Sequence, residues 1–461
     1  MVHGDAPLSP DFLDYRLDGA IDSGGSGLFT DGRGNRTLGR TLVLYWHSLI
    51  CGRASAHAPL PRLIFLLPST LAMSLAELYL DHNATTPLDP DVLDAMRPYF
   101  LTAGNAESRH SFGRKARLAW EYSKETVAQI LKADPSEVIF TSGGTEANNL
   151  AVFGLAGAES APGHIVATPI EHPAIAEPLA RLEAASFTIN RVPVDNQGVA
   201  DVPQMTRLFC DDTRFATLML ANNETGAIQP VCDLTVAARE RGILVHTDAV
   251  QAVGRIPVSF QDLEVATLAA SAHKFHGPPG IGLLLVRRGV RLGSRLFGGG
   301  QQQGRRPGTV PVPLVVGLAT ALQKWQSQSQ TRSQHWITLR DRLEKGLIHT
   351  LGAGRVIRNG PTANDQRLPQ TLNIGFPGLD GEVLLMQLDL AGIAASLGSA
   401  CASGSTRPSP TLMAMHVPDN WLRSSVRFSF GATTSEAEID EAIMRITQVV
   451  LRIDASKPSM T

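Results

Sequence analysis

The chain has 461 residues, of which 43% are hydrophobic and 18% charged, and its formal net charge is −2. These values are typical of a globular protein with two or more domains. A chain so close to neutral has no electrostatic basis for binding nucleic acid or an anionic membrane surface. Four cysteines are too few for a disulfide framework, their spacing matches no zinc site, and no apolar run approaches the ~20 residues of a membrane helix. We therefore expect a cytoplasmic protein with no metal, nucleic acid or membrane partner.

The first 74 residues differ in composition from the rest of the chain. Residues 1–40 are rich in Gly, Asp, Ser and Arg and have no hydrophobic period, which predicts disorder. The N-terminus is acidic where a signal peptide would be basic, which argues against a signal peptide. We expect residues 1–74 to be a disordered or non-core extension and Met73 to be an alternative start of the reading frame.

From residue 78 onward, short apolar runs typical of buried strands alternate with amphipathic stretches typical of helices. The expected strands cover residues 78–81, 138–140, 165–168, 187–192, 215–221, 243–246, 265–270 and 281–286. The expected helices cover residues 90–100, with Asp89 as N-cap, then 114–131, a run from 147, 174–185 and 233–241. This alternation predicts an α/β fold with a mostly parallel sheet and helices on both of its faces.

Polar clusters follow the ends of these strands. In sheets of this kind, ligands bind beyond the carboxyl ends of the strands. We therefore expect a ligand site built from Thr145, Glu171-His172, Asn222-Asn223, Asp248 to Gln251 and Ser271 to Lys274.

The first cluster, Thr141 to Glu146, lies between a strand and a helix. Backbone N–H groups and the positive end of the helix dipole face such a turn, which favours an anion. Turns of this kind also occur in α/β folds that bind nothing there, so the signal is weak by itself. Thr145 is the residue that we expect on a phosphate.

Lys274 follows a buried strand and precedes a turn that Gly277, Pro278 and Pro279 enforce. Poor hydration at such a position disfavours the ammonium form and makes the amine available, as a Schiff-base lysine requires. Ser271 and His273 beside it are suited to an anionic group such as a cofactor phosphate. The alternative, a lysine that leaves the sheet into solvent, is equally compatible with this stretch alone.

Asp248 and His172 each allow two interpretations. Asp248 is either the N-cap of a helix or the partner of a protonated pyridine nitrogen. His172 is either a solvated histidine before Pro173 or a ring that stacks on an aromatic cofactor and passes protons.

A long, glycine-rich and basic loop over residues 298–309 leads to the C-terminal part of the chain. We expect this loop to be mobile, and its simplest interpretation is a flexible linker. The elements expected after it are helices at 312–326 and 331–349, strands at 371–376 and 425–430, and helices at 381–390 and 436–453. The expected domains are a large one at 75–330, with 78–90 a candidate to pack with the small domain, a small one at 331–455, and a tail at 456–461.

Cys401 lies in a loop of small residues, 396–410, within the small domain. Glycine and serine make such a loop flexible, so we expect its cysteine to be exposed and reactive. Free cysteines elsewhere are usually small buried hydrophobic residues, and we expect this of Cys51, Cys210 and Cys232.

Several of these segments together resemble the cysteine desulfurases, which are pyridoxal 5′-phosphate enzymes of aminotransferase class V. The matching motifs are Leu80 to Pro87, Gly104-Asn105, Ser108 to Gly113, Thr141 to Glu146, Glu171-His172, Asn222 to Gly226, His246 to Gln251, the Lys274 stretch, Arg306 to Thr309 and Gly398 to Cys401. They occur in the family's order from about residue 78 to 453. The resemblance implies fold type I, with a mostly parallel seven-stranded sheet in the large domain and a smaller α+β domain. It also favours the cofactor role of Lys274 over the solvent-exposed alternative.

The resemblance implies a role for each matching residue. Lys274 would bind the cofactor covalently, with Asp248 at the pyridine nitrogen, Gln251 at the ring hydroxyl and His172 stacked on the ring. The phosphate would be bound by Thr145, Ser271 and His273, together with Thr309 from the partner subunit of a homodimer, and Gly144 would also belong to the cofactor site. Asn223, beside the cofactor, and Arg427 would hold the substrate carboxylate, for which a guanidinium fork is suited, and Cys401 would accept the sulfur.

The implied activity is removal of sulfur from L-cysteine, which gives L-alanine and a persulfide on Cys401. The sulfur would then pass to an iron–sulfur scaffold protein, to tRNA thiolation or to another carrier. The alternatives are a selenocysteine lyase, another class-V aminotransferase, and a non-enzymatic sulfur-binding protein that needs no cofactor.

We predict that a chain starting at Met73 folds and keeps full activity, because the regular pattern of strands and helices begins only at residue 78. Thermal unfolding and activity of this shortened chain, measured beside the full chain, test the prediction. Loss of folding would contradict it.

Overall fold

The computed structural model describes residues 76–157, 161–397 and 408–456. The predicted extension at residues 1–74 lies outside these ranges. Within them, no helix combines the length and the apolar character needed to cross a membrane.

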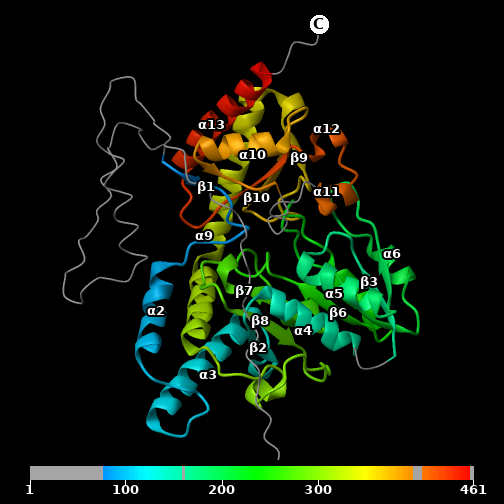
Figure 1. Ribbon diagram of the computed structural model, residues 1–461, viewed down its shortest axis with the longest axis vertical. Helices are drawn as coiled ribbons and strands as arrows, with labels where there is room; N and C mark the ends of the chain where they lie inside the picture. Colours follow the sequence, from blue (N-terminus) through cyan, green and yellow to red (C-terminus); the bar gives the residue numbers. More distant parts are fainter. Residues whose placement is uncertain (1–75, 158–160, 398–407, 457–461) are drawn as a thin grey trace, which may run out of the picture. The chain divides into compact units, whose positions relative to one another are not determined.

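The larger sheet has seven strands (Figure 1). Their order across the sheet is β2 (Val138–Thr141), β8 (Gly282–Val286), β7 (Thr267–Ser271), β6 (Leu244–Asp248), β5 (Thr213–Thr217), β3 (His164–Ala167) and β4 (Thr188–Arg191). All run parallel except β8, which is antiparallel to both of its neighbours. The predicted seven-stranded, mostly parallel sheet is confirmed.

Strands β2, β7 and β8 of this sheet are buried on both faces, as their continuous apolar runs predict. Successive residues of a strand point to opposite faces. Ile139 and Leu284 pack against α4 (Gly144–Ala156), whereas Phe140 and Leu283 belong to the core on the other face. Helices therefore cover both faces, and Figure 1 shows α4 lying across the strands on one of them.

Five of the helices around the larger sheet begin within three residues of their predicted starts, whereas those at Val202–Arg207 and Phe260–Leu263 were not predicted. In chain order, the helices are α2 (Pro90–Leu101), α3 (Ser111–Leu131), α4, α5 (Pro173–Ala184), α6 (Val202–Arg207), α7 (Val231–Arg239) and α8 (Phe260–Leu263). Asp89 caps α2 as predicted, because its carboxylate accepts a hydrogen bond from the backbone N–H of Asp91. Helix α3 begins three residues before the predicted Arg114, because the ring of His110 accepts from the N–H of Gly113 and caps the helix there.

A second sheet, built from the C-terminal part of the chain, has its own hydrophobic core. Its three antiparallel strands are β12 (Ser425–Ser429), β10 (Thr371–Gly375) and β9 (Ile357–Asn359), and a parallel pair joins β1 (Leu78–Tyr79) to β11 (Ile393–Ala394). The helices of this part are α10 (Gly381–Leu390), α11 (Pro410–Ala414), α12 (Asp419–Leu422) and α13 (Glu436–Ala455). Leu78 and Leu80 are members of this second core, so the start of the described chain packs with its C-terminal part.

The two helices predicted at residues 312–326 and 331–349 are one helix, α9 (Val312–Leu351). This correction has a physical cause. The stretch from 326 to 331 is almost entirely exposed, because it spans the gap between the two cores that the ends of α9 contact. A helix can be polar on all sides where it bridges two packed regions. The loss of the apolar period between residues 326 and 331 therefore did not mean that the helix ends there. Figure 1 shows α9 running from the larger sheet to α13.

We predict that Gln330→Pro destabilises the protein by at least ~3 kcal/mol, because proline removes a hydrogen bond inside α9 and clashes with the preceding turn. Gln330 is exposed, so Gln330→Ala is the matched control and should change stability by less than about 0.5 kcal/mol. Urea unfolding of both variants tests the continuity of α9. Equal stability of the two variants would mean that the helix is interrupted there.

Candidate active site

A cavity of about 270 Å³ lies beyond the carboxyl ends of β6 and β7. It is lined by nine of the predicted site residues, namely Gly144, Thr145, His172, Asn223, Asp248, Gln251, Ser271, His273 and Lys274. These residues come from the ends of different strands, so the topology of the sheet brings them together. The predicted clusters at the strand ends therefore form one site.

Lys274 ends a 3₁₀ turn, Ala272–Lys274, that directly follows β7. Its Nζ donates to the backbone oxygens of Asn83, at 2.6 Å, and of Ala84, at 2.8 Å. Lys274 and Ala84 both line the cavity, so the amine lies at the cavity and does not leave the sheet into solvent.

Asp248 is the last residue of β6 and is 5% exposed. Its Oδ1 accepts from the backbone N–H of Val250 at 2.9 Å, and its Oδ2 accepts from Nδ2 of Asn148 at 2.7 Å. Turns rather than a helix follow β6, so the interpretation of Asp248 as a helix N-cap is wrong. These two N–H donors fix the orientation of the side chain, which lines the cavity.

His172 is the N-cap of α5, and its Nδ1 accepts from the backbone N–H of Ala174 at 3.0 Å. In a neutral imidazole with Nδ1 as acceptor, the proton is on Nε2. The ring is half-buried and lines the cavity. Capping of the helix therefore fixes both the tautomer and the position of this ring.

The N-terminus of α4 faces the same cavity from the end of β2. Gly143 has an extended backbone and no side chain that caps the helix, so the first N–H groups of α4 are available to an anion. A Cβ atom on Gly144 would lie 2.7 Å from Cγ2 of Val250, so only glycine permits this close approach. Burial lowers the pKa of the nearby His273 to about 4, which keeps its ring neutral at pH 7.

Gln251 supplies a direct indication that a polar group belongs in the cavity. Its Nε2 donates to the backbone oxygen of Asn83 at 3.0 Å, whereas its buried Oε1 has no hydrogen-bond partner among the described residues. A buried acceptor without a donor is costly unless a ligand supplies one. The carboxylate, the amine, the anion site and this acceptor together suit a flat, phosphorylated heteroaromatic aldehyde.

Three predicted residues are not among those that line the cavity. Arg427 is buried in β12, where it forms an ion pair with Asp81 and donates to the backbone oxygen of Asn223 at 3.1 Å. Thr309 is exposed, and Cys401 lies outside the described residues. The basic loop that contains Thr309 is anchored to the larger sheet, because the side-chain amide of Gln302 exchanges two hydrogen bonds with the backbone of Phe140.

The prediction that Cys210 and Cys232 are buried is wrong, since both are exposed free thiols. Cys210 lies between α6 and β5, and Cys232 lies in the first turn of α7. Both cysteines lie near the ends of helices or strands, where a side chain can remain exposed instead of packing in the core. Cys51, for which burial was also predicted, lies outside the described residues.

Two buried polar residues near the cavity, Asn148 and His246, were missed as functional candidates, whereas Glu171 belongs to a cluster that was predicted to build the site. Asn148 and His246 form hydrogen bonds that end at Asp248, and Glu171 accepts at Oε1 from Oγ1 of Thr168 and from the N–H of Met219, both at 3.0 Å. Burial and the charge of Asp248 raise the pKa of Glu171 to about 8. The available signal was weak: a polar residue at an otherwise apolar position of a helix or strand.

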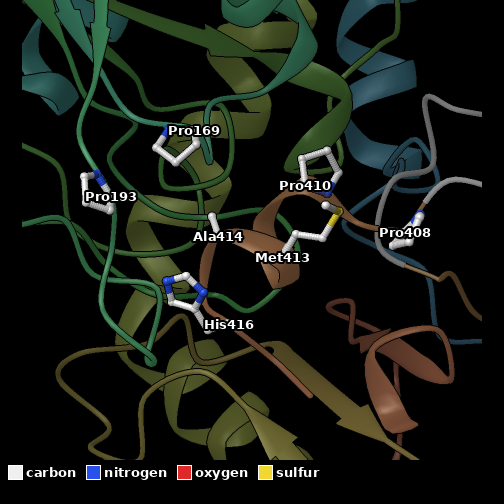
Figure 2. Close-up of a pocket in the computed structure, with 7 residues that line it drawn as sticks. All are labelled: Pro169, Pro193, Pro408, Pro410, Met413, Ala414 and His416. Carbon is white, nitrogen blue, oxygen red and sulfur yellow. The ribbon is translucent and has the colours of Figure 1, made fainter. Parts of the chain in front are cut away.

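A second hollow of about 670 Å³ lies beside α11 (Figure 2). It is lined by Pro169, Pro193, Pro408, Pro410, Met413, Ala414 and His416. Its lining is almost entirely apolar and contains no carboxylate or amine, so it lacks the groups found in the first cavity. Among the described residues, no cluster of three or more His, Cys, Asp or Glu side chains is placed to hold a metal ion.

Known proteins resemble the chain in sequence and in structure. The family model for class-V aminotransferases matches residues 78–442. A cysteine desulfurase of Nostoc sp. is 42% identical over 385 residues, which cover 83% of this chain and 95% of that protein. The cysteine desulfurase IscS of Dictyoglomus turgidum is 38% identical over 384 residues, 83% of this chain and 96% of that protein.

Two solved structures extend the comparison to the fold. A NifS-like protein superposes with a TM-score of 0.76 at 36% identity, covering 82% of this chain and 100% of its own. SspA in complex with cysteine superposes with a TM-score of 0.67 at 30% identity, covering 77% of this chain and 99% of its own. The sequence and the fold therefore agree on the same group of relatives.

We predict that Glu171→Gln flattens the pH dependence of stability. The folded pKa of about 8 lies above the ordinary value of 4.5, so unfolding between these pH values releases a proton and stability falls as pH rises. This single group contributes a slope of roughly 1 kcal/mol per pH unit inside that window. Urea unfolding at several pH values from 5 to 8 measures the slope.

The matched control is Glu177→Gln, which changes an exposed glutamate in α5, the helix that follows Glu171. This control should keep the slope of the unchanged protein. If Glu171→Gln keeps that slope as well, Glu171 is ionised in the folded protein.

Proposed function

From the premise that the chain belongs to the cysteine desulfurases of the class-V aminotransferase family, which uses pyridoxal 5′-phosphate, we propose that it binds this cofactor through Lys274 and removes sulfur from L-cysteine. One observation carries the proposal. The amine of Lys274, the carboxylate of Asp248 and the uncapped N-terminus of α4 line the same cavity. They match the aldehyde, the ring nitrogen and the phosphate of the cofactor in chemical character.

The other lining residues complete the proposed cofactor site. Gln251 has an unsatisfied buried acceptor suited to the ring hydroxyl, and the ring of His172 is suited to stack on the cofactor. The phosphate is assigned to Gly144, Thr145, Ser271 and His273. When bound, pyridoxal phosphate would supply an electron sink for the bonds broken at the substrate.

The chain's own groups carry the remaining chemistry. The amine of Lys274 moves the α-proton of L-cysteine, and its hydrogen bonds to Asn83 and Ala84 direct it at the cavity. Asn223 and Arg427 hold the substrate carboxylate, for which Arg427 would exchange its contact with Asp81 for a charge-assisted pair with substrate. The thiolate of Cys401 attacks the substrate sulfur and forms the S–S bond of a persulfide while the Cβ–S bond of the substrate breaks. The electron pair of the broken bond stays with Cβ, which takes up a proton, and L-alanine is released.

Cysteine as substrate is supported by SspA, which was solved in complex with cysteine and has the same fold as this chain. We further propose a homodimer in which Thr309 of the partner subunit reaches the phosphate. Large apolar side chains on α2 and α3 are exposed, among them Phe100, Leu101, Phe112 and Leu118. Exposed apolar residues on neighbouring helices are typical of a face that a partner covers. An iron–sulfur scaffold protein or another carrier would then take the sulfur.

We predict that the purified protein, given L-cysteine and a reductant, forms equal amounts of sulfide and alanine. Lys274→Ala should lose both the absorbance of bound cofactor and turnover, because it removes the amine that binds the cofactor. Cys401→Ala should keep the absorbance and lose at least ~100-fold in turnover, because it removes only the sulfur acceptor.

The exposed thiol of Cys210 provides the matched control for Cys401. Cys210→Ala should keep both absorbance and turnover. A colourless protein, or unchanged turnover in Cys401→Ala, would refute the proposed function.

A further inference from the structure

A line of buried polar side chains runs through the larger sheet to Asp248. Oγ1 of Thr267 in β7 lies 2.8 Å from Nδ1 of His246 in β6. Nε2 of the same ring lies 3.1 Å from Oδ1 of Asn148 in α4, and Nδ2 of Asn148 lies 2.7 Å from Oδ2 of Asp248. Thr267 and His246 are fully buried and do not line the cavity, so neither can touch a ligand there.

The chemistry of the groups fixes the direction of these hydrogen bonds. A carboxylate only accepts, so Asn148 must present its NH₂ group to Asp248 and its oxygen to His246. His246 must therefore carry its proton on Nε2, which leaves Nδ1 to accept from the hydroxyl of Thr267. Every donor in this series of hydrogen bonds points toward Asp248. Hydrogen bonds arranged in this way polarise and strengthen one another.

The ring of His246 keeps this arrangement because it stays neutral. Burial lowers its pKa to about 3, and no water-exposed face is left to hydrate a charged ring. A neutral imidazole has one donor and one acceptor, and both are occupied in this series of hydrogen bonds. A second proton would put a donor opposite Thr267 and remove the acceptor that sets the direction.

We propose that Asn148, His246 and Thr267 are positioning residues that hold Asp248 as a carboxylate able to bind the ring nitrogen of pyridoxal phosphate, an inference that rests on the function proposed above. The cofactor's power as an electron sink depends on a proton at that nitrogen. Asp248 keeps the proton there only while it is itself ionised. Asn148 donates to one oxygen of this carboxylate and the N–H of Val250 donates to the other, so the two hydrogen bonds fix its orientation.

The other ionisable groups near Asp248 work in the same direction. Glu171, which directly precedes the N-cap of α5, is protonated at neutral pH, so it places no second anion beside Asp248. His172 and Lys274 line the same cavity and bring no negative charge to it.

The test is the absorbance of the bound cofactor as a function of pH, measured on the full chain reconstituted with pyridoxal phosphate. A proton on the ring nitrogen repels a second proton elsewhere on the cofactor. If the carboxylate of Asp248 binds the protonated ring nitrogen less strongly, that nitrogen keeps its proton less well. The second proton then binds more tightly, and the titration midpoint moves to higher pH. We expect Asn148→Leu and His246→Phe to raise the midpoint by about one unit, a tenfold change in proton affinity.

The chain offers a conservative variant and a matched control. His246→Gln keeps a donor and an acceptor and should restore a midpoint close to that of the unchanged protein. Thr267→Val removes only the hydroxyl and should raise the midpoint by a smaller amount. Thr217→Val makes the same change in β5, directly beside His246, at a buried hydroxyl that has no hydrogen-bond partner among the described residues, and should leave the midpoint unchanged.

A merely structural role would lower the unfolding temperature of the variants without moving the midpoint. If Asn148→Leu and His246→Phe bind cofactor with an unchanged midpoint, the inference is wrong. If these two variants do not fold, an unchanged midpoint in Thr267→Val, or an equal shift in Thr217→Val, overturns it. If the unchanged protein shows no cofactor absorbance at all, the proposed function fails first and this inference falls with it.

Discussion

The backbone and side chain of Asn83 connect both sheets at the cavity, and the geometry of the site depends on this connection. The carbonyl oxygen of Asn83 accepts from Lys274 and Gln251, which belong to the larger sheet. Its N–H donates to Oγ of Ser429 at 2.8 Å, and its Nδ2 donates to Oγ1 of Thr371 at 2.9 Å, both in the smaller sheet. Each of these groups is buried or half-buried, so loss of one bond would leave a polar atom unsatisfied at a cost of about 1–3 kcal/mol.

Further hydrogen bonds to the backbone hold the segment around Asn83. The N–H of Thr86 donates to the oxygen of His273, and the guanidinium of Arg255 donates to the backbone oxygens of His82 and Lys274, both at 2.8 Å. The segment that carries Lys274 is therefore fixed on both sides. A lysine at the tip of a strand would otherwise sample many rotamers, and the entropy cost of placing its amine is met during folding rather than during binding.

Burial, rather than direct ion pairing, sets the electrostatics around the cavity. Burial lowers the pKa of His246 to about 3 and of His273 to about 4, and it raises that of Glu171 to about 8. All three groups are consequently uncharged at neutral pH. The carboxylate of Asp248 acts in this weakly polar setting, where its interaction with a cation is stronger than in water.

The amino-acid sequence by itself determined the seven strands of the larger sheet, that polar residues follow their ends, and to which family the chain belongs. These features are local, because burial and period are written in consecutive residues such as those of β7 and the turn to Lys274. It did not reveal that α9 is continuous, that Cys210 is exposed or that Asn148 and His246 serve Asp248. Only the tertiary structure decided these points, and it alone brought Lys274 to Asn83 across 191 residues of chain. The reason is that sheet order and the packing of helices on its faces, rather than any neighbouring pattern, choose which distant polar groups meet.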